Sequence, residues 1–184
     1  METTNYKIVS SNSNVEWTGR KVTGAHNGTI GIKEGNFIIE DGKVKEGKVV
    51  IDTTSIKILD VTDPATNTQF GGHLASDDFF SIEKFPTATF DVLSVKELSD
   101  TTFYLEGNLT IKDITHVAGF EATLENNRNA IALTGKMVID RTKYDIKFRS
   151  GNFFKDLGDT LIYNDFELDF NINAEAVFSE QSKN

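Results

Sequence analysis

The chain has 184 residues, enough for one domain that buries about 70% of the surface its unfolded chain exposes. It contains no cysteine, which excludes disulfides, thiol nucleophiles and thiolate metal sites. Its 28 acidic and 19 basic residues give a net charge of -9, which argues against nucleic acid and anionic membrane surfaces as partners.

Two kinds of segment are absent from the sequence. No run of about 20 apolar residues occurs, so we expect no transmembrane segment. The start of the chain, Met1 to Asn5, has neither a basic nor an apolar stretch of the kind found in export signals. As written, the chain is therefore expected to be cytoplasmic, and periplasmic only if a leader is missing from it.

Alternation of apolar and polar residues at every second position predicts antiparallel β-strands along most of the chain. In chain order they centre on Val15 and Trp17, Ile30 and Ile32, Phe37 and Ile39, Val49 and Ile51, and Phe90 and Val92, and then cover 103–111, 118–124, 131–139 and 166–175. Turn-forming residues lie between several of them, at 33–36, at Asp41-Gly42 and at 126–129. Asp41-Gly42 predicts a two-residue hairpin.

One segment lacks the alternation and predicts a short helical insert near residues 63–85. Asp63 and Pro64 are typical of a helix start, and Gly71-Gly72 would end that helix. Ser76 predicts the start of a second short helix, which Pro86 would stop. Such an insert needs an apolar surface to lie on, and the end of a β-barrel supplies one; it would form a lid there, or simply plug the barrel as core.

Many antiparallel strands with one apolar face predict an all-β fold in a single domain over 1–184, which is a sandwich or a barrel. The length of several strands and the small residues on their inward faces favour a barrel of about eight strands. Small residues recur midway along the apolar faces, as Gly107, Ala122, Gly135 and Ala174 do. They either let the strands coil or leave empty volume inside the barrel, and the spacing alone leaves both open.

Few residues suggest chemistry. His26, His73 and His116 lie in separate segments without metal-ligand spacing, so we expect no metal site. Asp77 and Asp78 are either paired carboxylates or, more commonly, acids at a helix start. The chain has 14 Phe but only 4 Tyr and 1 Trp, which suits a dry core and an unsaturated hydrocarbon guest alike.

The segment 141–149 concentrates positive charge. As a strand it would carry Arg141, Lys143, Lys147 and Arg149 on one face. This face is either simply solvated or a cationic patch near the mouth of the barrel that attracts a charged head group.

Four blocks of the sequence resemble the YceI-like family when taken in order. They are 15–30 with 47–56, the segment His73-Leu74-Ala75-Ser76-Asp77-Asp78-Phe79-Phe80 leading to 85–90, the segment 107–117, and Ile139-Asp140-Arg141-Thr142-Lys143-Tyr144. The sequence departs from the family pattern at Asp113 and Asp145, where the resemblance implies glycine.

The resemblance implies a lipocalin-like barrel whose apolar tunnel holds a long amphiphile, of the polyisoprenoid or isoprenoid quinone type. In the family, members often pair as dimers, which makes a homodimer possible for this protein, and many members are exported to the periplasm. On this basis we expect non-catalytic binding and carriage of such a lipid, with no cofactor. Two alternatives stay open: an enzyme acting on a lipid or small acid through Asp77, Asp78 and His73, and a filled barrel that serves as a protein interaction module.

The predicted site has three parts. The tunnel lining is Phe90, Val92, Phe103, Leu105, Gly107, Leu109, Phe120, Leu133, Gly135, Met137, Phe166, Leu168 and Phe170. The lid is Phe70, Leu74, Phe79 and Phe80. The candidates for contact with a polar head group are His26, Arg141 and Lys143.

Overall fold

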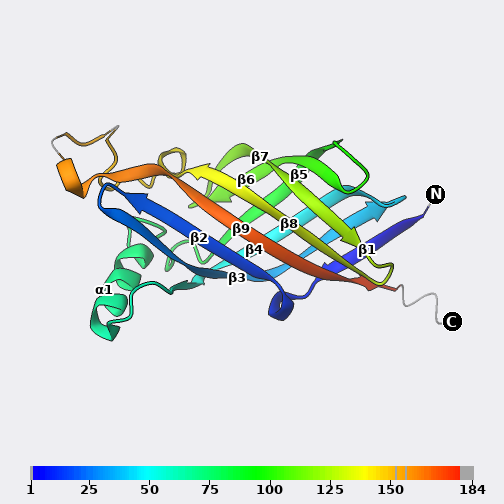
Figure 1. The fold of residues 1–184 in the computed structure, drawn as a ribbon, viewed down its shortest axis with the longest axis horizontal. Coiled ribbons are helices and arrows are strands. Elements are labelled where there is room, and N and C mark those ends of the chain that lie inside the picture. The colour runs from blue at the N-terminus through cyan, green and yellow to red at the C-terminus, as the bar shows by residue number, and fades with distance from the viewer. Residues whose placement is uncertain (1, 152, 156, 179–184) are drawn as a thin grey trace.

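An elongated antiparallel barrel is the main feature of the computed structural model, which describes residues 2–151, 153–155 and 157–178 (Figure 1). Within these residues the elements in chain order are β1 (Thr3–Ile8), η1 (Ser10–Asn12), β2 (Asn14–Lys21), β3 (Gly24–Glu40), β4 (Lys43–Ile58), α1 (Pro64–Ala75), β5 (Thr87–Glu97), β6 (Thr102–Ile111), β7 (Ile114–Asn126), β8 (Ala130–Asp140), η2 (Arg141–Tyr144), η3 (Gly158–Thr160) and β9 (Ile162–Val177).

The strands form one closed sheet. Their order is β1-β3-β2-β9-β8-β7-β6-β5-β4, and the pairing of β3 with β4 closes the ring. β1 and β2 are both antiparallel to β3 and to β9, and η1 separates them, so together they fill one place in the ring. The described chain thus closes with eight strand positions, which confirms the predicted lipocalin-like barrel.

The predicted hairpin at Asp41-Gly42 is also confirmed. Glu40 pairs with Lys43, and both turn residues have positive φ, 53° at Asp41 and 81° at Gly42. This backbone matches the twist of the two flanking strands. It fixes the register with which β3 and β4 close the barrel.

The predicted turn at 33–36 is wrong, because β3 runs through it as one strand of 17 residues. A register shift between Ile32 and Glu34 absorbs the irregularity as a bulge. A Cβ at Gly35 would lie 2.3 Å from the carbonyl oxygen of Lys48 and 2.7 Å from Ile8 Cδ1. The glycine therefore serves close packing between strands, and the pairing on both sides of β3 overrides the local turn preference.

The helical insert is confirmed as one helix, but its predicted end and its second helix are wrong. Asp63 caps α1 by accepting a hydrogen bond from Thr66 N at 2.9 Å, with Pro64 in the first position. The helix continues through Gly71-Gly72 to Ala75, because the buried Leu74 holds its last turn against the barrel.

Residues 76–86 fold back as turns instead of forming a second helix. Ser76 Oγ donates to His73 O at 2.6 Å, and the amides of Phe80 and Ile82 donate to the last turn of α1. Ser81 has a φ of 48°, a left-handed conformation that interrupts any helix.

The predicted strand at 141–149 is wrong as well. Asp140 Oδ1 accepts from both the amide and the hydroxyl of Thr142, which starts the 3-10 helix η2 directly after β8. Asp145 and Arg149 have φ values of 61° and 51°, so the segment is a folded loop. Asp113, the other departure from the family pattern, also has a φ of 61°; both acids thus hold a conformation that glycine adopts with less strain.

The barrel has two different ends (Figure 1). The end at which β1 begins and β9 ends, here the terminal end, also carries the hairpins β3–β4 and β7–β8. The opposite end, here the helical end, carries α1, the turns of 76–86 and the loop from η2 to β9. Among the described helices none is long and apolar enough to cross a membrane.

Candidate functional site

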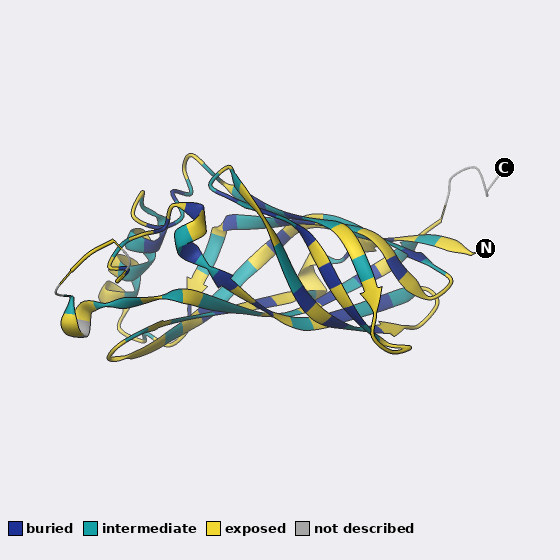
Figure 2. Cartoon of the chain, turned by 90° about the horizontal axis from the view of Figure 1, so that it is seen from above, coloured by how far each residue is buried: buried dark blue, intermediate teal, exposed yellow. Residues whose placement is uncertain are grey.

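All the residues predicted to line the tunnel project from one face of the sheet. Residues directly opposite each other in paired strands share a face, and Phe170 lies opposite Val15 of β2 and Gly135 of β8. The same alternation continues around the ring through the pairs Gly135–Ala122, Phe103–Ala122, Leu105–Phe120, Gly107–Val92 and Leu109–Phe90. Burial of this face and exposure of the other identify it as the interior of the barrel (Figure 2).

Near the terminal end this interior is packed with the protein's own side chains. Phe103 and Leu105 of β6 are 0% exposed and Leu133 of β8 is 2% exposed. Phe37 is seated against Gly47, where a Cβ would come within 2.6 Å of its ring. These side chains have almost no surface free to touch a guest.

A layer of aromatic rings crosses the middle of the barrel. The ring centroids of Phe90 and Phe120 are 5.3 Å apart, and those of Phe120 and Phe170 are 5.0 Å apart. Gly107 and Gly135 lie on the strands between them, and a Cβ there would be 2.6 Å from the Phe90 ring and 2.7 Å from the Phe170 ring. Phenyl rings therefore occupy the volume next to the two inward glycines. Of the two possibilities that the sequence left open, empty volume at these positions is thus ruled out.

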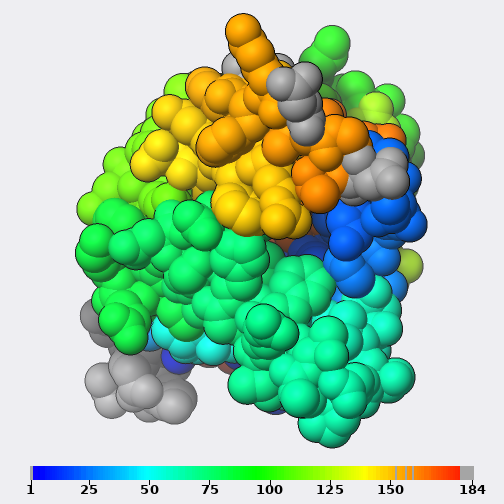
Figure 3. Space-filling view, turned by 90° about the vertical axis from the view of Figure 1, so that its left-hand side faces the viewer, coloured from blue at the N-terminus to red at the C-terminus, as the bar shows by residue number. Residues whose placement is uncertain are grey.

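Between this layer and the helical end, several inward apolar side chains keep accessible surface, while Leu109, Met137 and Ile139 are buried. Phe166 and Leu168 of β9, Ala118 of β7 and Ile30 of β3 are only partly buried although they face the interior. Figure 3 looks onto this end and shows a hollow between the turns after α1, the golden segment that starts at η2 and the blue β2–β3 hairpin. The structure thus combines an apolar interior with an opening at one end.

The four predicted lid residues all lie at the helical end. The Phe70 ring meets the His26 ring edge-on at 4.7 Å, and the Phe79 ring lies 5.6 Å from that of Phe148. Leu74, in the last turn of α1, is buried. Phe80 reaches the barrel wall, with its ring centroid 6.3 Å from that of Phe166.

The three histidines, far apart in sequence, gather at this end as well. His26 Nδ1 lies 2.8 Å from Asp60 Oδ2, and His116 Nε2 lies 3.0 Å from the carbonyl oxygen of Lys143. Partial burial alone would raise the pKa of Asp60, but hydrogen bonds from Asn27 N and from His26, with the charge of His26, lower it below its usual value. Each histidine thus joins segments around the opening, and among the described residues no three His, Asp or Glu side chains meet in a way that could hold a metal ion.

Arg141 holds the loop at the opening, and each of its three guanidinium nitrogens donates to a backbone carbonyl. Its Nη1 donates to Ile146 O at 2.7 Å, its Nε to Tyr163 O at 3.0 Å and its Nη2 to Ile162 O at 3.0 Å. Burial lowers the pKa of its guanidinium, and the charge of Asp140 raises it in part. Lys143, two residues on, is exposed, and it and His26 are the head-group candidates on accessible surface.

His73, Asp77 and Asp78, the residues of the enzymatic alternative, form hydrogen bonds and ion pairs within and around the turns after α1. His73 Nε2 lies 3.0 Å from Asp78 Oδ2, while the His73 ring packs between those of Phe79 and Phe148. Asp77 accepts from Ser81 Oγ at 2.6 Å; this hydrogen bond and the charge of Lys84 lower the pKa of Asp77. All of these contacts stabilise the fold around the opening.

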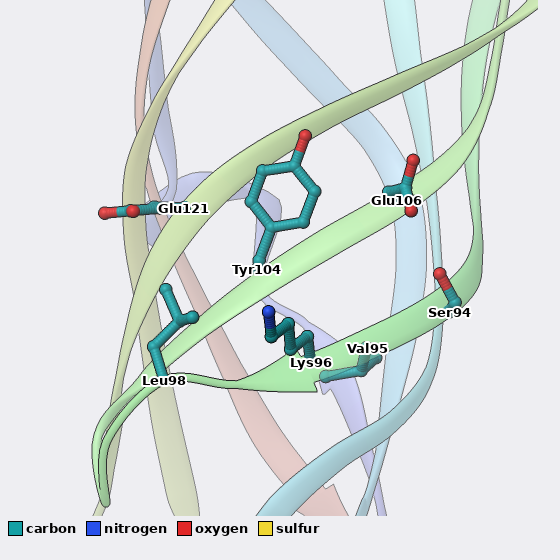
Figure 4. Close-up of a pocket in the computed structure, with 7 residues that line it drawn as sticks. All are labelled: Ser94, Val95, Lys96, Leu98, Tyr104, Glu106 and Glu121. Carbon is teal, nitrogen blue, oxygen red and sulfur yellow. The ribbon is translucent and has the colours of Figure 1, made fainter.

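Two open grooves lie on the outer surface of the barrel, where the sequence predicted none. One, of about 480 Å³, follows β5 to β7 and is lined by Ser94, Val95, Lys96, Leu98, Tyr104, Glu106 and Glu121 (Figure 4). The other, of about 550 Å³, lies beside β8 and β9 and includes Arg20, Val138 and Glu167. Their mixed, partly charged linings differ from the apolar interior.

Two residues outside the predicted tunnel lining and lid, Trp17 and Phe148, also shape the interior at the helical end. Trp17 faces inward opposite Leu168, and its Nε1 donates to Lys57 O at 3.2 Å. Phe148 joins the lid rings although it was assigned to a strand. The alternation at Val15 and Trp17 could have identified Trp17, whereas no local pattern marks Phe148.

Comparisons with known proteins agree with one another. The family model described as "YceI-like domain" matches residues 6–174. A UPF0312 protein of Pseudomonas putida is 30% identical over 96 residues, which are 52% of this chain and 47% of that protein. Protein YceI of Salmonella arizonae is 29% identical over 133 residues, 71% of this chain and 65% of that protein. The chain thus spans about half to two thirds of the length of these curated relatives.

Solved structures share the fold at low sequence identity. BcnA of Burkholderia cenocepacia superposes with a TM-score of 0.70 at 18% identity, covering 91% of this chain and 99% of BcnA. A polyisoprenoid binding domain from Saccharophagus degradans, implicated in plant cell wall breakdown, gives a TM-score of 0.65 at 16% identity, with 94% and 98% of the two chains covered. At these identities the likeness concerns the fold.

Proposed function

The chain belongs to the YceI-like family, and from this premise we propose that it binds, without chemical conversion, an amphiphile with a polyisoprenoid-type tail inside the barrel. A lipid-binding role in general agrees with the fold and with the polyisoprenoid binding domain among its structural neighbours. Isoprenoid quinones belong to the same proposal, because their tails have the same chemistry.

One observation carries the proposal: partly accessible apolar side chains face the interior beneath an opening. Phe166 and Leu168 keep surface that no protein atom covers, although the alternation points them away from solvent. Removing hydrocarbon from water is favourable by about 25 cal/mol per Å² of apolar surface. A hydrocarbon tail inserted here would gain this energy on both surfaces without needing hydrogen bonds.

The tail would enter at the helical end and leave its polar head group at the rim. The lid ring of Phe80 lies against Phe166 and would cover the inserted tail. His26 and Lys143 are the candidates for contact with the head group. Arg141 supports this site indirectly, since its three carbonyl partners fix the loop that forms one side of the opening.

Carriage of the lipid between sites and pairing as a homodimer extend the proposal. Light scattering of the purified protein with and without lipid tests the pairing. Transfer of a fluorescent prenyl lipid from donor to acceptor vesicles tests carriage, and faster transfer with the protein present is the expected result.

The binding itself is tested by extraction and by competition. Organic extraction of natively purified protein followed by mass spectrometry should recover an isoprenoid-type lipid. Farnesol should displace the dye 1-anilinonaphthalene-8-sulfonate from the protein, and Leu168→Trp, which fills the interior, should abolish the displacement. Val138→Trp is the matched control, because Val138 neighbours Leu168's partner Met137 on β8 but is exposed on the outer face.

A filled barrel that acts as an interaction module is the second candidate function. The solid packing near the terminal end and the rings seated on Gly107 and Gly135 favour it. Absence of any extracted lipid, together with unchanged dye binding in Leu168→Trp, would favour the interaction module over lipid binding.

A further inference from the structure

The aromatic layer spans the barrel from one wall to the opposite one. In the ring of eight strand positions, β5 and β9 are separated by three strands on either side, and β7 lies midway between them on one side. Phe90, Phe120 and Phe170 come from these three strands and contact one another in series. A chain of three rings therefore crosses the interior.

The alternation of ring and glycine along this layer keeps the rings in place. Gly107 of β6 and Gly135 of β8 stand between the ring-bearing strands, and each takes one ring against its Cα. Val15 and Val49, buried and paired with Phe170 and Phe90, complete the layer on the other wall.

Inward side chains differ in accessibility on the two sides of this layer, although Met137 and Ile139, which pair with Leu168 and Phe166, are buried. On the side of the helical end, Phe166 and Leu168 retain accessible surface. On the side of the terminal end, Phe103 and Leu105 retain none. The opening that Figure 3 shows lies at the helical end, on the accessible side of the layer.

We propose that Phe90, Phe120 and Phe170 form a floor that limits how much of an apolar tail this barrel accepts, so that tail length is a specificity determinant. The inference rests on the proposed function and restricts the ligand to an amphiphile whose inserted tail ends at mid-barrel. From Phe166 to Phe170 the strand advances about 13 Å at roughly 3.3 Å per residue, and the tilt of barrel strands makes the depth still smaller.

The test compares prenyl alcohols of increasing length, namely geraniol, farnesol, geranylgeraniol and solanesol, as competitors of the bound dye in the full chain. With the wild-type protein we expect affinity to rise with length and then to level off before solanesol. Phe170→Ala removes one ring of the floor and should strengthen binding of the longer alcohols by roughly tenfold or more, since tenfold corresponds to burial of about two additional methylene groups. Geraniol should be affected little.

Phe170→Leu is the second variant in case the alanine variant does not fold, and Phe103→Leu is its matched control beneath the floor. We expect that in Phe170→Leu the affinity keeps rising to longer alcohols than in the wild type, and that in Phe103→Leu the dependence of affinity on alcohol length is unchanged. Affinity that keeps rising to solanesol in the wild type, or an unaltered length profile in both Phe170 variants, would overturn the floor while leaving lipid binding intact. If no alcohol of any length displaces the dye, the proposed function fails and the floor with it.

Discussion

The two halves of this barrel share strands, register and inward apolar residues, yet they use their interiors differently. Toward the terminal end, rings and aliphatic side chains fill the space, as Phe37, Phe103 and Leu105 do. Toward the helical end, Phe166 and Leu168 occupy equivalent positions of the alternation but are not fully covered. The same two-residue period thus builds a solid core and an accessible apolar wall, and the difference arises from what lies across the barrel from each side chain.

The largest expected effect contrasts one phenylalanine from each half. Phe103→Ala should lower the free energy of unfolding by about 3–5 kcal/mol, because it empties a fully packed site, with dye and farnesol binding unchanged. Phe166→Ala should cost only about 1–2 kcal/mol, since its ring is partly accessible already, but should weaken farnesol binding. Urea denaturation and dye competition measure the two quantities; equal losses of stability would contradict the division into two halves.

Arg141 connects the opening to the barrel wall, and its removal should be the next largest effect. Arg141→Ala leaves the carbonyls of Ile146, Ile162 and Tyr163 without their donors and should lower stability by about 3 kcal/mol. Lys143→Ala, a control on the same short helix with an exposed side chain, should leave stability nearly unchanged. Thermal unfolding compares them, and similar melting temperatures for both variants would argue against the role assigned to Arg141.

The boundary between the halves can be tested at its glycines. Gly135→Ala places a Cβ against the Phe170 ring and 2.6 Å from Glu121 O, which should destabilise the protein by about 1–3 kcal/mol. Gly72→Ala is the opposite case, because nothing lies within 4 Å of a Cβ there and the residue is helical. It should stabilise α1 by up to about 1 kcal/mol. Guanidinium denaturation of both variants would show whether the sign differs as expected.

The smallest expected effect is a pH dependence confined to the rim of the opening. The pKa of Asp60 is lowered in the folded state, so its contribution to stability is present above its ordinary pKa and is lost as the pH falls through the folded value. Asp60→Asn removes this contribution at neutral pH. The melting temperatures of wild type and variant should therefore differ slightly near neutrality and converge in acid; a gap that widens in acid would contradict the assignment.

Local sequence patterns predicted correctly the elements whose conformation depends on residues adjacent in the chain. The hairpin at Asp41-Gly42 and the capped start of α1 at Asp63-Pro64 are as predicted, because a turn and a helix cap depend on adjacent residues. The turn at 33–36 and the helix end at Gly71-Gly72 failed because strands β1 and β4 pair with β3 and because Leu74 packs against the barrel. The strand from Arg141 failed for a local reason, since Asp140 accepts from Thr142 and starts η2. For the site, the alternation identified which side chains face inward.

What the sequence determined by itself is the set of inward residues, since a period of two assigns every strand side chain to one of two faces. The tertiary structure alone decided that glycines 107 and 135 receive rings, that each guanidinium nitrogen of Arg141 donates to a backbone carbonyl, and that three histidines distant in sequence lie at the same end of the barrel. The physical reason is that the direction in which a side chain points is a property of its own strand. Whether the space in front of that side chain is filled or open depends on side chains from the opposite wall of the barrel, and their positions follow from the closure of the whole ring.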